Sequence, residues 1–317
     1  MESLKSRIKD SRNIKEKSLN AYIISLRKIH EKTKTEKDFK NLDWLKNEKK
    51  VMDILNEMKL TTRKNYIAAV IVALTTDKEK YESEIKYFRN ELDKIAKEYN
   101  NQIDEQKKTE TQEKNWVSLK KLRKVMRYYK NQIIEKGILK KELPLSNKDF
   151  DLLQKWVVSS LYILDENPPL RNDYIMKVIS NKDFDDLKED DLKKNYLVIK
   201  SRNNKFFHLG EYKTDKKFGP KKLEVGSKLN SVLNIWLKFN KSGNLLLNSK
   251  KAPMTPNGLT KYLNKVFEPT GKNNISSTMI RHIFISEKIG GPTIKEKQEL
   301  AEKMGHSTDT QEKYKKQ

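Results

Sequence analysis

The segment TMIRHIFISEKIGGPTIKEKQELAEKMGHSTDTQEKY, residues 278–314, carries more information than any other part of the chain. Arg281 stands in an apolar helical pattern, His306 follows a glycine that ends the next helical pattern, and Tyr314 comes eight residues later. A guanidinium grips phosphate oxygens through two parallel donors, an imidazole exchanges protons near neutral pH, and a phenol oxygen can attack phosphorus. These residue types together predict chemistry on a phosphate.

The composition predicts a folded protein without a membrane span. The 317 residues are 35% hydrophobic and 9% aromatic, which allows two domains with their own cores. No apolar run approaches the roughly 20 residues of a membrane helix, and the start MESLKSRIKDSRN lacks a secretory apolar region. We therefore expect a soluble, intracellular protein.

Cysteine and histidine usage limits the kinds of site. The chain has no cysteine and four scattered histidines, which excludes disulfides and Cys-based zinc sites. We expect catalysis without a cofactor or structural metal, although this count does not exclude a carboxylate-bound Mg²⁺.

The net charge of +24 favours a polyanionic partner, because clustered cations release the counterions condensed on nucleic acids. An A+T-rich genome would also enrich lysine without any selection for DNA binding. Arginine usage helps to separate these explanations. Only ten of the 68 basic residues are arginine, and three of these lie beyond residue 130: Arg171, Arg202 and Arg281. Such rare arginines are expected where a planar, two-pronged donor is needed.

Hydrophobic periodicity predicts a mainly α protein with a small antiparallel β-meander, an α+β fold. Four helical patterns occupy about 15–31, 44–58, 63–76 and 78–104, with Thr61 or Thr62 able to cap the third. The polar stretch 101–115 is typical of a linker or of a helix that bridges two domains. Three β-rich runs follow later, NYLVIKS, KFFHLGEYKT and KKLEVGS. The other expected helices lie at about 117–136, 147–164, 226–240, 255–267, 276–289 and 293–304, with a short one around Tyr314.

Three local signals predict how helices begin and end. Ser146 or Asn147 can cap the helix at 147–164, and Gly305 suits the left-handed position after a helix. Thr308 and Gln311 have the spacing of a capping box for the last helix.

Four segments in this order resemble the tyrosine recombinases, or phage-type integrases: PPLRNDY (168–174), EYKTDKKFG (211–219), TMIRHIF (278–284) and EKMGHSTDTQEKY (302–314). The resemblance implies a helical DNA core-binding domain over residues 1–108 and a catalytic domain over 109–317. It implies a site-specific recombinase or integrase of a mobile element or virus. Such a protein would be DNA-associated, in a prokaryotic cytoplasm or in a viral or host nucleus or factory. Such an enzyme cleaves and rejoins double-stranded DNA through a 3′-phosphotyrosyl intermediate, as a homotetramer on two duplexes and without a cofactor.

The resemblance also implies roles for individual residues. Arg171 and Arg281 would hold the non-bridging oxygens of the scissile phosphate and the charge that builds on them. His306 would donate a hydrogen bond to the phosphate, and Tyr314 would be the nucleophile. Lys213 would be the general acid towards the leaving 5′ oxygen.

Several positions leave alternatives open. Lys216 and Lys217 are rivals to Lys213 on the same turn. Thr278 stands where the family usually has histidine, and its hydroxyl can hydrogen-bond a phosphate but cannot shuttle protons at neutral pH. Asp173 follows the first arginine by two residues, where the family usually has an acid after three. Lys315, Lys316 and Gln317 follow the tyrosine, so the C-terminal helix that many relatives exchange between subunits is missing or different.

Each residue also has an ordinary interpretation, such as a surface ion pair, a solvated lysine or a histidine after a helix stop. For the whole chain three alternatives remain. A type IB topoisomerase-like enzyme would use much the same residues as a monomer. A non-catalytic DNA-binding protein on a decayed recombinase scaffold would bind DNA without forming an adduct. A lysine-rich RNA-associated protein would explain the charge but leave the ordered segments to coincidence.

Overall fold

A computed structural model describes residues 4–35, 37–104, 108–164, 168–288 and 294–314. The chain divides into two compact units, Met1–Glu105 and Gln106–Gln317. Both units are mainly helical, and one small sheet lies in the second unit, which confirms the predicted α+β class. Within the described residues, we find no helix with the length and apolarity needed to span a bilayer. The tail 315–317, for which the sequence raised the question of subunit exchange, lies outside the described residues.

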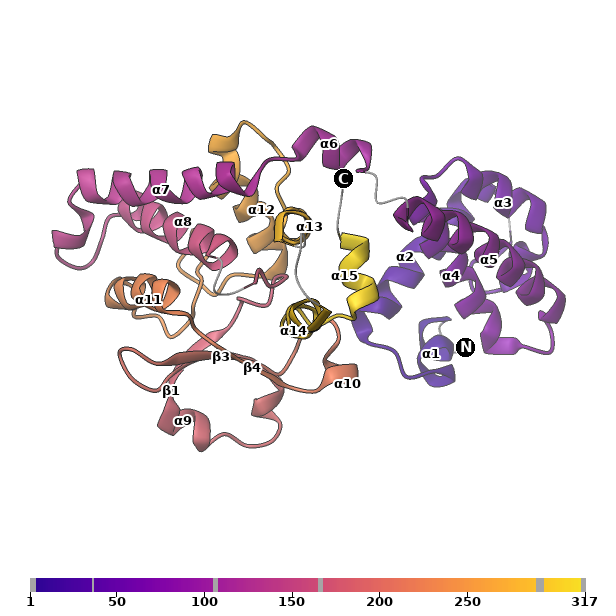
Figure 1. The fold of residues 1–317 in the computed structure, drawn as a ribbon. Helices are drawn as coiled ribbons and strands as arrows, with labels where there is room; N and C mark the ends of the chain where they lie inside the picture. The colour runs from indigo at the N-terminus through magenta and orange to yellow at the C-terminus, as the bar shows by residue number, and fades with distance from the viewer. Residues whose placement is uncertain (1–3, 36, 105–107, 165–167, 289–293, 315–317) are drawn as a thin grey trace. The chain divides into compact units, whose positions relative to one another are not determined.

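The first unit is a bundle formed around one apolar helix (Figure 1). Its elements are α1 (Leu4–Ser11), α2 (Glu16–Thr33), η1 (Leu42–Lys46), α3 (Glu48–Asn56), α4 (Leu60–Leu74), η2 (Thr75–Asp77) and α5 (Glu82–Asp104). Helix α4 contacts α2, α3 and α5, and most of its residues from Ile67 to Leu74 are buried. A helix that is apolar on most sides is buried on most sides, as the sequence predicted.

Two predictions for the first unit were wrong in detail. We expected the first helix near residue 15, but α1 precedes it and buries Leu4 and Ile8. Two apolar residues among charged ones are too few for a period to be recognised. We also expected Thr61 or Thr62 to cap α4. The helix begins at Leu60 after Lys59, which makes no side-chain cap.

The second unit has a helical core to which the sheet is joined. Its helices are α6 (Glu110–Asn115), α7 (Leu119–Glu135), η3 (Ile138–Lys140), α8 (Asn147–Ile163), α9 (Asn181–Asp185), η4 (Asp191–Lys193), α10 (Asp215–Phe218), α11 (Ser227–Phe239), α12 (Pro256–Phe267), η5 (Glu268–Thr270), α13 (Ser277–Lys288), α14 (Ile294–Lys303) and α15 (Thr308–Tyr314). Helix α8 packs against α7, α11 and α12, and nearly all of its second half is buried. Ser146 caps α8 by accepting from Asp149 N at 3.1 Å, as predicted.

The stretch predicted as a linker is partly helical. Helix α6 begins at a capping box in which Thr109 and Gln112 satisfy each other's backbone N–H groups. Residues 105–107 lie outside the described residues.

The sheet has four strands, in the order β1 (Lys177–Ser180), β2 (Asn195–Ile199), β3 (Lys205–Leu209) and β4 (Lys221–Glu224). Strands β2, β3 and β4 form the predicted antiparallel meander, with Asn195 opposite Leu209 and Phe206 opposite Glu224. The prediction of three strands was incomplete, because β1 pairs in parallel with β2. Four residues with no clear alternation give too little signal for a strand in sequence.

Strand β3 is buried along its whole length, between the main core and the short helix α9 (Figure 1). Its first residue is a fully buried lysine. The Lys205 ammonium donates to the side-chain oxygens of Asn230 at 2.7 Å and Asn234 at 2.6 Å, and to the Arg202 carbonyl at 2.7 Å. These bonds tie the β2–β3 turn to α11, which fixes the sheet on the helical core.

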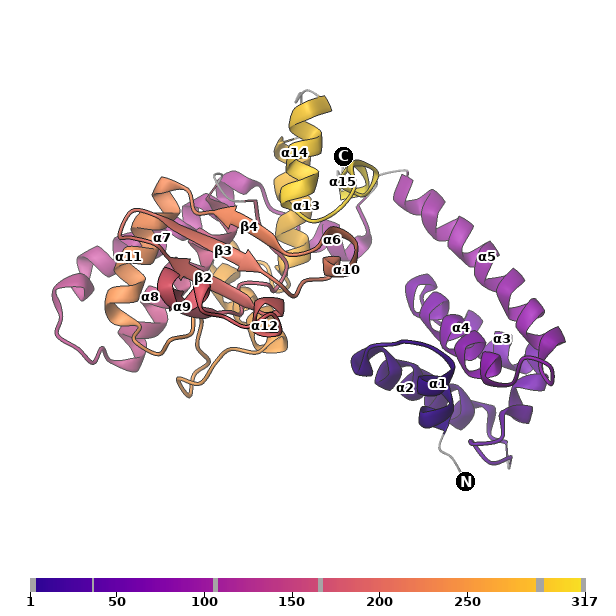
Figure 2. The ribbon, with the colours of Figure 1, turned by 90° about the horizontal axis from the view of Figure 1, so that it is seen from below.

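The last three helices converge at one place, where α15 contacts both α13 and α14 (Figure 2). Gly305 has a φ of +69°, which confirms the predicted left-handed residue after α14. The capping residue of α15 was predicted one position too late. Ser307 Oγ, rather than Thr308, accepts from the backbone N–H of Thr310 at 3.2 Å.

Candidate active site

Tyr314 lies within a group of cationic and aromatic side chains from three parts of the second unit. Arg171 Nη2 donates to the Tyr314 hydroxyl at 3.3 Å. The Arg281 guanidinium carbon lies 5.4 Å from the centre of the tyrosine ring. The His306 ring stacks on the tyrosine ring, with centroids 5.5 Å apart and planes 12° apart. The structure thus brings together four of the six residues that the sequence singled out.

Arg281 is buried on α13, with 1% of its surface exposed. Its Nη1 donates to the Pro169 carbonyl at 2.6 Å and its Nη2 to the Met304 carbonyl at 3.4 Å. Burial, together with the charge of Arg171, lowers its pKa to about 10, so it stays positive at neutral pH. One buried arginine therefore holds the loop before Arg171 and the end of α14 in a single arrangement.

The loop that carries Arg171 is fixed from its other side as well. The hydroxyl of Tyr162 on α8 donates to the Arg171 carbonyl at 2.5 Å. Asn172 donates to Thr260 Oγ1 on α12 at 3.1 Å and accepts from Ser277 Oγ at 3.1 Å. These contacts hold the Arg171 backbone between α8, α12 and α13. The position from which its side chain extends is therefore fixed.

The two arginines set the acidity of Tyr314. Burial of the phenol raises its pKa, but the positive charges of Arg281 and Arg171 outweigh burial, so the pKa of Tyr314 lies below its usual value of 10.0. The Asp173 carboxyl shows the opposite balance, since burial raises its pKa in spite of the same arginines. The group therefore favours the phenolate, the form of tyrosine that acts as a nucleophile.

His306 is buried beside these cations. Burial and the charges of Arg281, Arg171 and Lys221 lower its pKa to about 4, so the ring is neutral at neutral pH. Its Nδ1 lies 3.0 Å from the Ser307 carbonyl, and its Nε2 is buried without a partner among the described residues. The Arg281 Nε is also buried and unpartnered. A buried polar atom without a partner costs free energy, which a polar ligand bound beside Tyr314 would recover.

Lys213 and Thr278 are the two predicted residues outside this group. Both side chains are exposed, and among the described residues neither has a hydrogen bond or ring contact with Tyr314. Lys213 nevertheless lies in a segment that contacts the turn after α14, which carries His306. Its neighbour Thr214 donates to the Gly305 carbonyl at 2.6 Å. The rivals Lys216 and Lys217 are exposed on α10.

Three further residues near the site were not predicted from the sequence to take part in its chemistry. His282 Nδ1 lies 2.9 Å from the Tyr314 carbonyl, and the two rings are 4.7 Å apart. Lys221 donates to the Glu302 carbonyl, which joins β4 to the end of α14. Gln311 on α15 is 1% exposed, and neither of its amide atoms has a partner within the described part of the chain. The only sequence signal for His282 was its place in the Arg-His pair. Lys221 is one lysine among 58, and Gln311 was interpreted as a capping residue.

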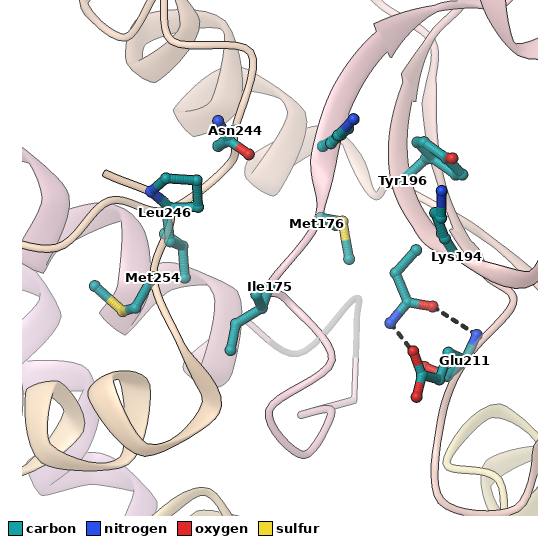
Figure 3. A pocket seen from close by; sticks show the side chains of 11 residues that line it. Ile175, Met176, Lys194, Tyr196, Glu211, Asn244, Leu246 and Met254 are labelled. Atoms are coloured by element: carbon teal, nitrogen blue, oxygen red, sulfur yellow. Dashed lines mark hydrogen bonds between the residues drawn. The ribbon is translucent and has the colours of Figure 1, made fainter. Parts of the chain in front are cut away.

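A separate cavity of about 270 Å³ lies between β1, β2 and the segment 244–254 (Figure 3). Its lining includes Met176, Asn195 and Glu211 and none of the six predicted residues. The Asn195 side chain exchanges two hydrogen bonds with the backbone of Glu211, at 2.8 and 2.9 Å, and donates to the Asp173 carbonyl at 3.5 Å. Asn195 thus supports both the Arg171 loop and the start of the segment that leads to Lys213.

Comparisons with known proteins leave the family of the chain open. No protein-family model matches it, and no curated protein matches it. Among solved structures the chain is similar to one described as the crystal structure of XerA recombinase. The TM-score is 0.40 and the identity 10%, over 98% of this chain and 92% of that chain. A similarity of this size supports no assignment of function.

Proposed function

We propose that the protein is a site-specific DNA recombinase of the tyrosine recombinase type, with Tyr314 as the nucleophile. One observation carries the proposal. The Tyr314 hydroxyl accepts a hydrogen bond from Arg171 at 3.3 Å beside the buried Arg281, and the two cations lower its pKa. A phenol in such surroundings is prepared to attack an anionic, electrophilic centre, and a phosphodiester is the centre that two arginines would hold.

The proposed reaction is a transesterification. The Tyr314 oxygen forms a bond to phosphorus, the bond from phosphorus to the 5′ oxygen breaks, and a 3′-phosphotyrosyl link remains. Arg171 and Arg281 stabilise the charge on the non-bridging oxygens, and Lys213 protonates the leaving 5′ oxygen. Attack by the 5′ hydroxyl of a second strand reverses these steps. The phosphoester energy is conserved, so the scheme uses no nucleotide hydrolysis.

Double-stranded DNA is the proposed substrate, and the charge of +24 supports a polyanion of this kind. A homotetramer on two duplexes is the assembly that the sequence resemblance implies. A type IB topoisomerase-like enzyme would form the same covalent link as a monomer, and product topology separates the two. Threonine at position 278, where the family usually has histidine, favours a third possibility, a binding protein without catalysis.

The test is trapping of the covalent intermediate. A labelled duplex library is nicked just 3′ of each candidate site, so that the short fragment with the new 5′ hydroxyl escapes. Denaturing electrophoresis then compares the wild type with Tyr314→Phe and with Tyr128→Phe, a change at a half-exposed tyrosine on α7. We expect a protein–DNA adduct in the wild type and Tyr128→Phe and none in Tyr314→Phe. Tight DNA binding without an adduct in the wild type would support the binding protein instead.

A further inference from the structure

The surroundings of His306 determine which of its two nitrogens carries the hydrogen. Nδ1 lies 3.0 Å from the Ser307 carbonyl oxygen. A carbonyl oxygen only accepts, so Nδ1 is the donor, and the single N–H of a neutral imidazole is then at Nδ1. Nε2 is left with a lone pair, buried and without a partner among the described residues. In this state Nε2 is an acceptor and not the donor to phosphate that the family resemblance implies.

The same ring lies against the nucleophile. The His306 and Tyr314 rings are stacked with their centroids 5.5 Å apart. No hydrogen bond joins Nε2 to the phenol oxygen in this arrangement, so proton transfer requires the two atoms to approach when the substrate is bound. Arg171 already donates to the phenol oxygen, so the hydrogen of the phenol needs an acceptor elsewhere. Position 278, where the family usually has histidine, holds an exposed threonine whose hydroxyl does not take up a proton at neutral pH. Two imidazole rings contact the Tyr314 ring, those of His282 and His306. Of these two, His306 is the one whose Nε2 is buried without a partner among the described residues.

We infer that His306 Nε2 is the proton acceptor for Tyr314; this inference rests on the proposed function. As the tyrosine oxygen bonds to phosphorus and the bond to the 5′ oxygen breaks, the phenol proton moves to Nε2. The resulting imidazolium still donates from Nδ1 to Ser307, and the leaving 5′ oxygen takes its proton from Lys213. In the rejoining step the imidazolium returns its proton to the tyrosine oxygen.

The charges around His306 couple this step to substrate binding. Arg171 reaches the group from the loop after α8, Arg281 from α13 and Lys221 from β4, and Tyr314 lies on α15. Burial and these cations hold the pKa of His306 at about 4, which makes it a weak base in the free protein. A bound phosphodiester carries a negative charge that offsets the arginines and raises that pKa. His306 therefore gains basicity when the substrate is in place.

The experiment measures adduct formation by His306→Ala, His306→Gln and Lys213→Ala on a suicide duplex selected from the library. A second form of the duplex carries sulfur in place of the bridging 5′ oxygen, and the thiolate leaves without protonation. We expect His306→Ala to lose about a hundredfold in rate at neutral pH, the size typical of a lost general base. Its rate should rise about tenfold per pH unit until Tyr314 ionises, and added imidazole should restore part of it.

Lys213→Ala and His306→Gln complete the design. The sulfur-substituted duplex should restore the rate of Lys213→Ala but not that of His306→Ala. Added imidazole should restore part of the rate of His306→Ala but not that of Lys213→Ala. His306→Gln places an amide nitrogen near the Nε2 position, so it keeps a donor but not a base. We expect it to be as slow as His306→Ala. Thermal unfolding of each variant checks its fold, and the glutamine variant serves if the alanine variant does not fold.

The outcomes that contradict the inference differ from those that contradict the proposed function. A wild-type rate in His306→Gln, or a pH-independent deficit in His306→Ala that sulfur repairs, would overturn the assignment of His306 as base while the recombinase chemistry stands. Absence of any adduct in the wild type on both duplexes would remove the proposed function, and the role of His306 with it.

Discussion

Arg171 Nη2 donates to the hydroxyl of Tyr314 across 3.3 Å, although the two residues are 143 positions apart in the chain. The contact joins the loop after α8 to the last described helix. It depends on Arg281, which is bonded to the carbonyl of Pro169 in that loop and lies over the tyrosine ring. The acidity of the phenol is therefore set by tertiary structure and not by α15 alone.

The first prediction is that Arg171→Gln raises the pKa of Tyr314, because one of the two cations that stabilise the phenolate is lost. The adduct should form about a hundredfold more slowly at neutral pH. The pKa is measured from tyrosinate absorbance at alkaline pH, as the difference between each protein and the same protein with Tyr314→Phe. Arg202→Gln is the matched control, since Arg202 is exposed on the β2–β3 turn. An unchanged Tyr314 pKa would contradict the assignment of Arg171.

The second prediction concerns the segment that carries Lys213. Thr214→Val removes the hydrogen bond to the Gly305 carbonyl at little change in volume. Loss of one such bond costs about 1 kcal/mol, so we expect adduct formation to slow by about fivefold. Thr75→Val is the control, because Thr75, the first residue of η2, donates to the Val72 carbonyl in the last turn of α4. If Thr214 acts by positioning Lys213, its effect should shrink in a Lys213→Ala background. Full additivity would show that the two residues act independently.

The sequence predicted the class of the fold because its signals are local. Ser146 was recognisable as a cap and Gly305 as a helix stop, since each acts within four residues of its place in the chain. The parallel strand β1 was missed because its partner β2 begins only after α9 and η4. The pairing of distant segments leaves little trace in a four-residue pattern.

Part of the candidate site could be predicted from the sequence for a different reason. Its residue types are chemically distinctive, so Arg171, Arg281, His306 and Tyr314 could be singled out before their proximity was known. Features that depend on contacts between distant segments could not be found in that way. The tautomer of His306 depends on its contact with the carbonyl of Ser307. The contact between His282 and Tyr314 depends on the packing of α13 against α15.

The third prediction uses the unsatisfied amide of Gln311. This side chain is buried on α15, and neither amide atom has a hydrogen-bond partner among the residues that the structure describes. Gln311→Met removes the cost of the unpaired polar atoms at similar volume, and we expect the free energy of unfolding to rise by about 1 kcal/mol. Thermal unfolding measures the gain, with Gln132→Met, a change at an amide bonded to Glu135, as the control. A lower stability of Gln311→Met would mean that the amide is satisfied in solution. Slower adduct formation in the stabilised variant would show that the amide serves the reaction.

The fourth prediction is a loss of stability on mild acidification that His306 causes. Its pKa is about 4 in the folded protein against 6.5 for an ordinary histidine. Above the higher value the ring is neutral in both states. As the pH falls below 6.5, His306 becomes protonated in the unfolded chain but stays neutral in the folded protein. Stability is therefore lost progressively down to about pH 4, by roughly 2 kcal/mol once solvent screening is allowed for.

The measurement compares the wild type with His306→Asn, so that the contributions of the carboxyl groups, which titrate in both proteins, cancel. Hydrogen exchange of peptides from α13 reports opening of the site itself, which matters because two compact units need not unfold together. The wild type should lose more protection than the variant between pH 6.5 and about 4, and the two should run parallel above that window. Equal losses throughout would mean that His306 titrates normally. It would then be partly protonated near neutral pH, and the cationic, desolvated surroundings assigned to Tyr314 would be wrong as well.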